Sequence, residues 1–253
     1  MNFWSLYRKD LRQLLMPMLV LLLAGLGWHV FWVYQSAKIP KAEFKIIISF
    51  IFPLAILPIT LIWFGYRSFK NEWKQNTIYT LLSLPCSGQR LIGSKILAAF
   101  TYYLAVILLQ ALVIIFTYQV SISSGLSILE SKLQVSPPLL FATMIFFLLL
   151  WGGYLYLLAQ FSYLVSKLWD KFNLAVSIAT FLIMNYLLDK LAQLLAPVFN
   201  WLPPLFYLSN QEADGVINFS LNIESSGELA VWLLILAGVY WLNGWLLENQ
   251  LDV

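Results

Sequence analysis

The chain has 253 residues, of which 61% are hydrophobic and 11% are charged, and its net charge is +3. An ordinary globular domain carries about 25% charged residues, so this composition and a mean hydropathy of +0.79 predict a polytopic membrane protein. The small charge, spread between apolar runs, argues against nucleic-acid binding. The single cysteine, Cys86, excludes an internal disulfide, and the single histidine, His29, argues against a histidine-rich metal centre.

Residues 1–16 are predicted to form an amphipathic interfacial helix, an elbow that lies on the membrane before the first span. Apolar side chains fill one half of its helical wheel, and Arg8, Lys9 and Arg12 fill the other. Such a helix lies in the headgroup plane with its basic face toward anionic lipid. Pro17 favours a break at this point, because proline kinks a helix interior. The alternative is that these residues begin the first span itself.

Six apolar segments are long enough to span a membrane, which takes about 20 residues each. They are residues 18–34, 46–66, 96–120, 139–165, 172–195 and 229–247. The sequence therefore predicts an all-α polytopic membrane protein in which residues 1–253 form a single transmembrane domain.

Lysine and arginine residues in the connecting segments predict the orientation of these spans. With the N-terminus inside, ten of the fifteen lie in inner segments and five in outer segments. The prediction is a multi-pass protein of the cell membrane with both termini in the cytoplasm. Residues 67–95 then form a cytoplasmic loop, and residues 196–228 lie outside.

The outer segment 196–228 opens with an apolar and aromatic stretch that Pro197, Pro203 and Pro204 interrupt. It is too short and too broken to span the membrane, which is typical of a re-entrant or interfacial element. A loop lying on the membrane surface is the alternative.

Residues 88–95 have the spacing of a phosphate-binding loop, but Ser94 precedes Lys95 where that motif needs lysine followed by serine or threonine. Nucleotide binding is therefore not expected here. The apolar spans contain few ionisable groups besides His29 and Asp189, which argues against an ion-coupled carrier. No set of residues typical of an intramembrane hydrolase is present in the sequence, so we expect no enzyme.

The loop at 67–95 is predicted to contain a short helix between residues 69 and 84. Trp73, Thr77 and Leu81 fall on one apolar stripe, with Ile78 and Leu82 beside it. The proline at position 85 ends this helix, because the residue before a proline disfavours the α conformation. Such a helix either lies on lipid or inserts into a groove of a partner protein.

The loop carries a motif composed of Glu72, Thr77, Leu81, Leu82, Pro85, Ser94 and Lys95. In this pattern it resembles the first cytoplasmic loop of ABC-2 type permeases, the membrane subunits of bacterial ABC exporters. A glycine often precedes the threonine in that family, and here the residue is Asn76. The expected layout, with an elbow helix, six spans and cytoplasmic termini, is similar to that family over nearly the full length.

This resemblance implies a permease subunit of an ATP-driven exporter, which pairs with a second copy or a related permease in the lipid bilayer. It also implies a cytosolic ATPase partner that binds ATP and Mg²⁺, while this chain binds no cofactor. The short helix would be the coupling helix that docks on the ATPase. Its docking residues would be Glu72, Trp73, Lys74, Thr77, Ile78, Leu81, Leu82 and Pro85. A secondary carrier or channel and a non-transport membrane subunit remain alternatives.

Overall fold

The computed structural model describes residues 3–35, 42–75, 87–117, 137–169, 173–199, 201–202, 204–213, 216–225 and 227–249. Within these ranges, side chains are described over residues 3–31, 34–35, 56–75, 87–113, 145–169, 173–199, 201–202 and 227–249.

The described residues form six long helices. They are α1 (Phe3–Gln35), α2 (Ala42–Lys74), α4 (Gly88–Thr117), α6 (Pro137–Ser166), α7 (Asn173–Leu195) and α8 (Gly227–Asn249). A 3-10 turn, η2 (Ala196–Phe199), follows α7, and two strands, β1 (Pro204–Ala213) and β2 (Val216–Ser225), precede α8.

Five described segments are long and apolar enough to cross a membrane. They are Phe3–Phe31, Gly88–Val113, Ile145–Ser166, Asn173–Phe199 and Gly227–Asn249. The expected second span, 46–66, lies inside α2, whose 33 residues give a helix about 50 Å long. The chain is thus a multi-pass membrane protein.

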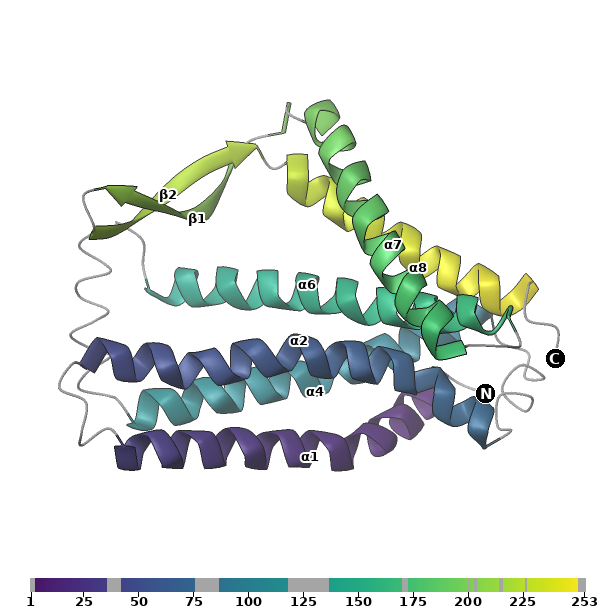
Figure 1. Cartoon of the computed structure of the whole chain (residues 1–253), viewed down its shortest axis with the longest axis horizontal. Coiled ribbons are helices and arrows are strands. Elements are labelled where there is room, and N and C mark those ends of the chain that lie inside the picture. Colours follow the sequence, from purple (N-terminus) through teal and green to yellow (C-terminus); the bar gives the residue numbers. More distant parts are fainter. Residues whose placement is uncertain are drawn as a thin grey trace.

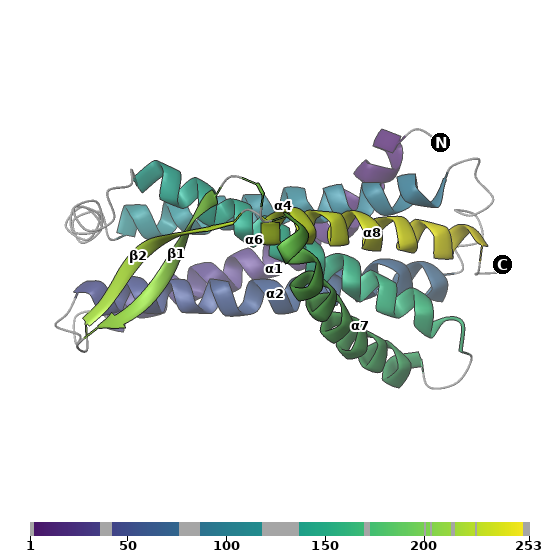
Figure 2. The same ribbon diagram turned by 90° about the horizontal axis from the view of Figure 1, so that it is seen from above.

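Helices α1, α2, α4 and α6 run side by side along the long axis, while α7 leans away from them and α8 crosses behind it (Figures 1 and 2). The principal neighbours are α1 with α4, α2 with α6, α6 with α7, and α8 with both α4 and α6. The first turns of α1 and α4 and the last turns of α2, α6 and α8 gather at one end of the bundle (Figure 1), which we call the terminal end.

Helix α6 forms the centre of the bundle, because every residue from 152 to 160 is buried. Glycine allows α2 to approach it closely, since a Cβ at Gly65 would lie 2.5 Å from the carbonyl oxygen of Tyr156. Helices α1 and α4 meet similarly, where a Cβ at Gly25 would lie 1.9 Å from Nε2 of Gln110. The Gln110 amide oxygen lies 2.5 Å from Nε2 of His29, so this histidine is buried and hydrogen-bonded.

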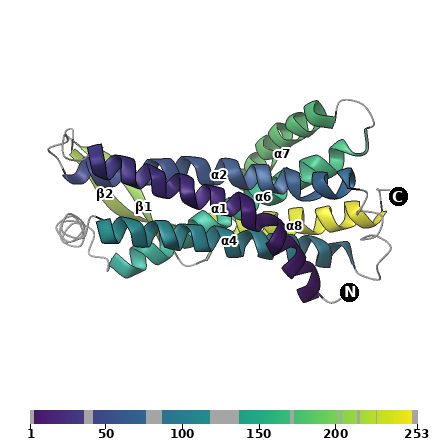
Figure 3. The same cartoon turned by 90° about the horizontal axis from the view of Figure 1, so that it is seen from below.

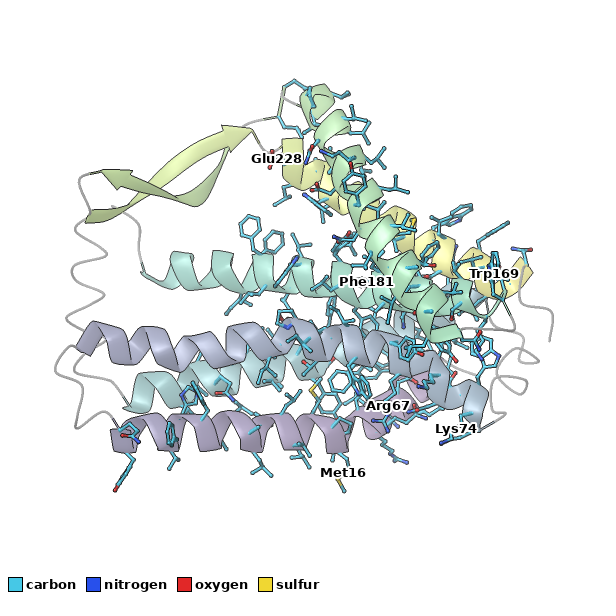
Figure 4. The ribbon with its side chains drawn as sticks, in the orientation of Figure 1. Met16, Arg67, Lys74, Trp169, Phe181 and Glu228 are labelled. Carbon is cyan, nitrogen blue, oxygen red and sulfur yellow. The ribbon has the colours of Figure 1, made fainter. Side chains whose placement is uncertain are left out.

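The expected separation of an elbow at 1–16 from a first span at 18–34 is wrong, because α1 continues through Pro17 without ending. Proline removes one helical hydrogen bond and bends a helix, and apolar residues on both sides let the helix continue. The ribbon of α1 does bend, near the labelled Met16 (Figure 4). Residues 3–16 thus continue into the expected first span as one bent helix.

The loop expected at residues 67–95 also begins later in the chain than predicted. Helix α2 extends past residue 66 to Lys74, so residues 69–74 belong to this long helix and do not start a separate short one. Helix α4 begins at Gly88, so residues 88–95 form its first two turns. Between these helices, residues 76–86 lie outside the described part of the chain.

The segment 196–228 contains the turn η2 and an antiparallel hairpin, an addition to the helical body that the sequence analysis did not anticipate. In the hairpin register Phe206 pairs with Ile223 and Leu208 pairs with Leu221. The hairpin extends from the junction of α7 and α8 toward the end of the bundle opposite the terminal end (Figure 1).

Candidate functional site: a buried ion network at the terminal end

The start of α4 is anchored against α8. The carbonyl of Ser87 accepts the amides of Arg90 and Leu91 at 3.0 and 3.3 Å and so closes the first turn. The amide of Gly88 donates to the Glu248 carboxylate of α8. A Cβ at Gly88 would lie 2.7 Å from the carbonyl oxygen of Gly244, so only glycine permits this approach. The anchored helix then carries Lys95 about 10 Å into the bundle.

The ammonium of Lys95 is the centre of the site. It donates to Oδ1 of Asp10 on α1 at 3.1 Å and to Oε1 of Glu72 on α2 at 2.8 Å. The carbonyl oxygen of Ser68 lies 3.5 Å away as a third acceptor. An ammonium has three N–H donors, so three acceptors from two other helices satisfy it.

Two further side chains complete the arrangement. Lys9 donates to Oε1 of Glu72 at 2.9 Å, and the Ser94 hydroxyl donates to Oδ2 of Asp10 at 2.9 Å. The two ammonium groups and two carboxylates balance in charge. We call Lys9, Asp10, Glu72, Ser94 and Lys95 the ion network.

The charges of the ion network are almost entirely withdrawn from solvent. Asp10 is 5% exposed, Glu72 1% and Lys95 3%. Only the side chain of Lys9, 30% exposed, reaches toward the surface. A buried ion pair adds little net stability, but removing one partner strands the other and costs about 3–5 kcal/mol. The network therefore fixes how α1, α2 and α4 lie relative to one another.

Helix α6 joins the network through its neighbours. The hydroxyl of Tyr156 donates to the carbonyl of Lys95 at 3.3 Å, and the Gln160 amide donates to the Ser68 hydroxyl at 3.1 Å. The ring of Phe69 packs below the Lys95 ammonium, 5.2 Å from its centroid. All four helices that run side by side are thus connected at this point.

An aromatic cluster lies next to the network, where α2 ends against α6. The ring of Trp73 lies 6.2 Å from that of Phe69 and 5.9 Å from that of Tyr163, centroid to centroid. The ammonium of Lys167 lies 5.7 Å from the Trp73 ring and 5.6 Å from the Tyr163 ring. These contacts hold the last turn of α2 on the last turns of α6.

The expected docking residues divide into three groups. Glu72 is buried in the ion network and Trp73 is half-buried in the aromatic cluster, so both contact this chain. Lys74 is exposed at the end of α2. Outside the described residues lie Thr77, Ile78, Leu81, Leu82 and Pro85.

The basic residues assigned to the elbow also differ from one another. Arg8 and Arg12 are exposed, as expected for a face toward headgroups, whereas Lys9 turns inward to Glu72. Sequence reasoning missed the role of Asp10 altogether. A signal was available, because Asp10 is the only acidic residue before Glu43 and lies among basic ones.

The site's chemistry is that of a fixed ionic contact. Lys95 lies one position beyond the place of the lysine in a phosphate-binding loop. It belongs to a helix and is neutralised by two carboxylates. Within the described residues, no group of three His, Cys, Asp or Glu side chains could hold a metal ion.

Residues 3–187 match the model of a family described as ABC-2 family transporter protein. The chain belongs to this ABC-2 family. The matched region contains α1, α2, α4, α6 and the first part of α7, and therefore the whole ion network. No curated protein and no solved structure was found to match. As an ABC-2 permease the chain is a membrane component of transport and is not itself the catalyst.

Proposed function

We propose that this ABC-2 permease is the membrane subunit of an ATP-driven exporter, with six spanning helices and half of the translocation path. A second copy or a related permease supplies the other half. A separate cytosolic ATPase binds ATP and Mg²⁺ and docks at the terminal end.

The ion network is the observation that carries this proposal. Helices α2 and α4 flank residues 76–86, which contain most of the expected docking residues, and Glu72 and Lys95 join the two flanking helices directly. A force applied to this loop by an ATPase would reach both helices together. It would also reach α1 through Asp10, because separating buried partners costs several kcal/mol.

The charge of the terminal end supports a cytoplasmic location. Exposed basic side chains there include Arg8, Arg12, Arg67, Lys70 and Arg90. Cytoplasmic ends of spanning helices carry such an excess of lysine and arginine. Both ends of the described chain would then lie in the cytoplasm with the docking loop.

A secondary carrier is less well supported. Carriers of that class place ionisable groups along a path through the membrane. In the part of the chain whose side chains are described, the buried Asp, Glu and Lys residues are Asp10, Glu72 and Lys95, all gathered at the terminal end. The buried imidazole of His29 lies apart from them on α1 and is hydrogen-bonded to Gln110. This arrangement suits a mechanical connection better than a relay.

Docking is tested by co-purifying the ATPase with the full chain. Leu81→Asp places a charge on the apolar stripe, and we expect it to reduce ATPase recovery at least tenfold, since apolar anchors dominate such interfaces. Lys70→Gln, an exposed change on α2 one turn before the stripe begins at Trp73, is the matched control. Full ATPase recovery with Leu81→Asp would contradict docking through this segment.

A further inference from the structure

A groove of about 370 Å³ lies between α1 and α2 near the terminal end. This volume falls within the roughly 300–1,000 Å³ typical of ligand pockets. The proline of α1 accounts for the groove. Pro17 has no N–H to bond the carbonyl of Gln13, and its ring forces the helix to bend. Figure 3 shows the N-terminal part of α1 turning away from α2, which separates the two helices here.

One end of the groove is polar and basic. Gln13 lines it from α1, and Arg67 and Asn71 line it from α2. Nε of Arg67 donates to Oδ1 of Asn71 at 3.4 Å, and the guanidinium lies 5.9 Å from the Trp63 ring. These contacts orient the planar guanidinium, whose N–H groups suit the oxygens of a phosphate.

The other end of the groove is apolar. Met16, Pro17 and Val20 line it from α1, and Phe64 lines it from α2. Met16 is 72% exposed and Val20 66% exposed on the single chain, so this half opens sideways along the helices. The groove is therefore polar at one end and apolar at the other.

The change from polar to apolar coincides with the expected membrane boundary. No Asp, Glu, Lys or Arg occurs at residues 13–35 of α1 or 46–66 of α2. Gln13 and Arg67 thus mark the headgroup level on both helices, and Met16 and Val20 lie one to two turns deeper in hydrocarbon.

The charge around the groove is positive. Asp10 and Glu72 are neutralised within the ion network by Lys95 and Lys9. Among the side chains of α1 and α2 that the structure describes, every exposed charged one is basic. These side chains are Arg8, Arg12, Arg67, Lys70 and Lys74. Such a surface is complementary to an anionic headgroup.

We propose that this groove binds an anionic glycerophospholipid from the leaflet at the terminal end. The phosphate contacts Arg67 at the polar end, and an acyl chain follows Met16 and Val20 between the helices. This lipid site goes beyond the permease function and requires no ATPase.

Native mass spectrometry of the full chain tests the site directly. The chain is reconstituted into vesicles of equal parts phosphatidylglycerol and phosphatidylcholine, extracted, and its retained lipid counted. We expect the wild type to retain phosphatidylglycerol in preference. Arg67→Gln should lower that retention about tenfold, because it removes one charge-assisted contact to the phosphate. Arg90→Gln removes an exposed cation on α4, away from the groove between α1 and α2, and should leave retention unchanged.

Two more variants distinguish binding of a whole lipid from binding of a free phosphate, and a specific loss of retention from general misfolding. Val20→Trp fills the apolar half and should weaken retention although Arg67 remains. Arg67→Lys keeps the charge without the planar fork and should give an intermediate loss. Equal retention of both lipids by the wild type, or no effect of Arg67→Gln or Val20→Trp, would overturn the proposal. Displacement of the lipid by millimolar inorganic phosphate alone would also overturn it.

Discussion

Glu72 and Lys95 meet at 2.8 Å between the end of α2 and the start of α4, the two helices that enter and leave the expected docking loop. Asp10 of α1 lies on the other side of the same ammonium at 3.1 Å. Two loop-flanking helices and the first helix of the chain are therefore joined by one buried cation, which makes this residue the most informative one to change.

Lys95→Met should lower the free energy of unfolding by about 3–5 kcal/mol, because it leaves the Asp10 carboxylate buried without a cation and leaves Glu72 with Lys9 alone. Thermal unfolding of the chain in detergent measures the loss. The triple variant Lys95→Met, Asp10→Asn, Glu72→Gln should recover most of it. A melting temperature of Lys95→Met equal to that of the wild type would contradict the buried pairing.

The contact between α4 and α8 predicts a cost for a single methyl group at position 88. Gly88→Ala would place Cβ 2.7 Å from the carbonyl oxygen of Gly244, so the helices must separate. We expect a loss of about 1–3 kcal/mol. The control is Gly238→Ala on α8, where the added Cβ would meet no other part of the chain within 4 Å and which should be neutral or stabilising. Equal unfolding temperatures for the two variants would argue against the close approach.

The aromatic cluster predicts a structural role for Trp73. Trp73→Ala removes ring contacts with Phe69 and Tyr163 and should cost about 2 kcal/mol, less than for a fully buried aromatic residue. Trp73→Phe should retain part of this. Unfolding of the purified chain without the ATPase is the measurement. An unchanged melting temperature would assign Trp73 to the partner's surface instead.

The orientation can be checked with the single cysteine of the chain. A membrane-impermeant thiol reagent applied to intact cells should miss Cys86, because the distribution of basic residues predicts that the loop containing it is cytoplasmic. In a Cys86→Ala background, Gly215→Cys should react, because segment 196–228 is expected outside. The reverse pattern of labelling would invert the proposed topology.

Five of the six predicted spans correspond to helices long and apolar enough to cross a membrane, because long apolar runs have few alternative structures in lipid. Helix ends were harder, since α2 continues past the end of its apolar run through Arg67 and Lys70 and ends only at Lys74. Pro17 likewise marks a bend and not a boundary.

The sequence contains a signal for the hairpin, which the expectation of an all-helical protein overlooked. Apolar residues alternate with polar ones from Ile217 to Ile223, the period of a strand. The ion network was different, because Asp10 and Lys95 are 85 positions apart and only the packing of α1 on α4 brings them together. No local pattern specifies such a pair.

The double variant Lys9→Gln, Glu72→Gln tests the central claim most directly. It preserves the balanced pair of Asp10 and Lys95, so the chain should fold, but it removes the ionic link from α2 to α1 and α4. ATP hydrolysis by the complex with its ATPase is measured in lipid vesicles, with Lys70→Gln as control. We predict that the ATPase co-purifies normally while hydrolysis falls about tenfold or more. Hydrolysis at the wild-type rate would contradict coupling through the ion network.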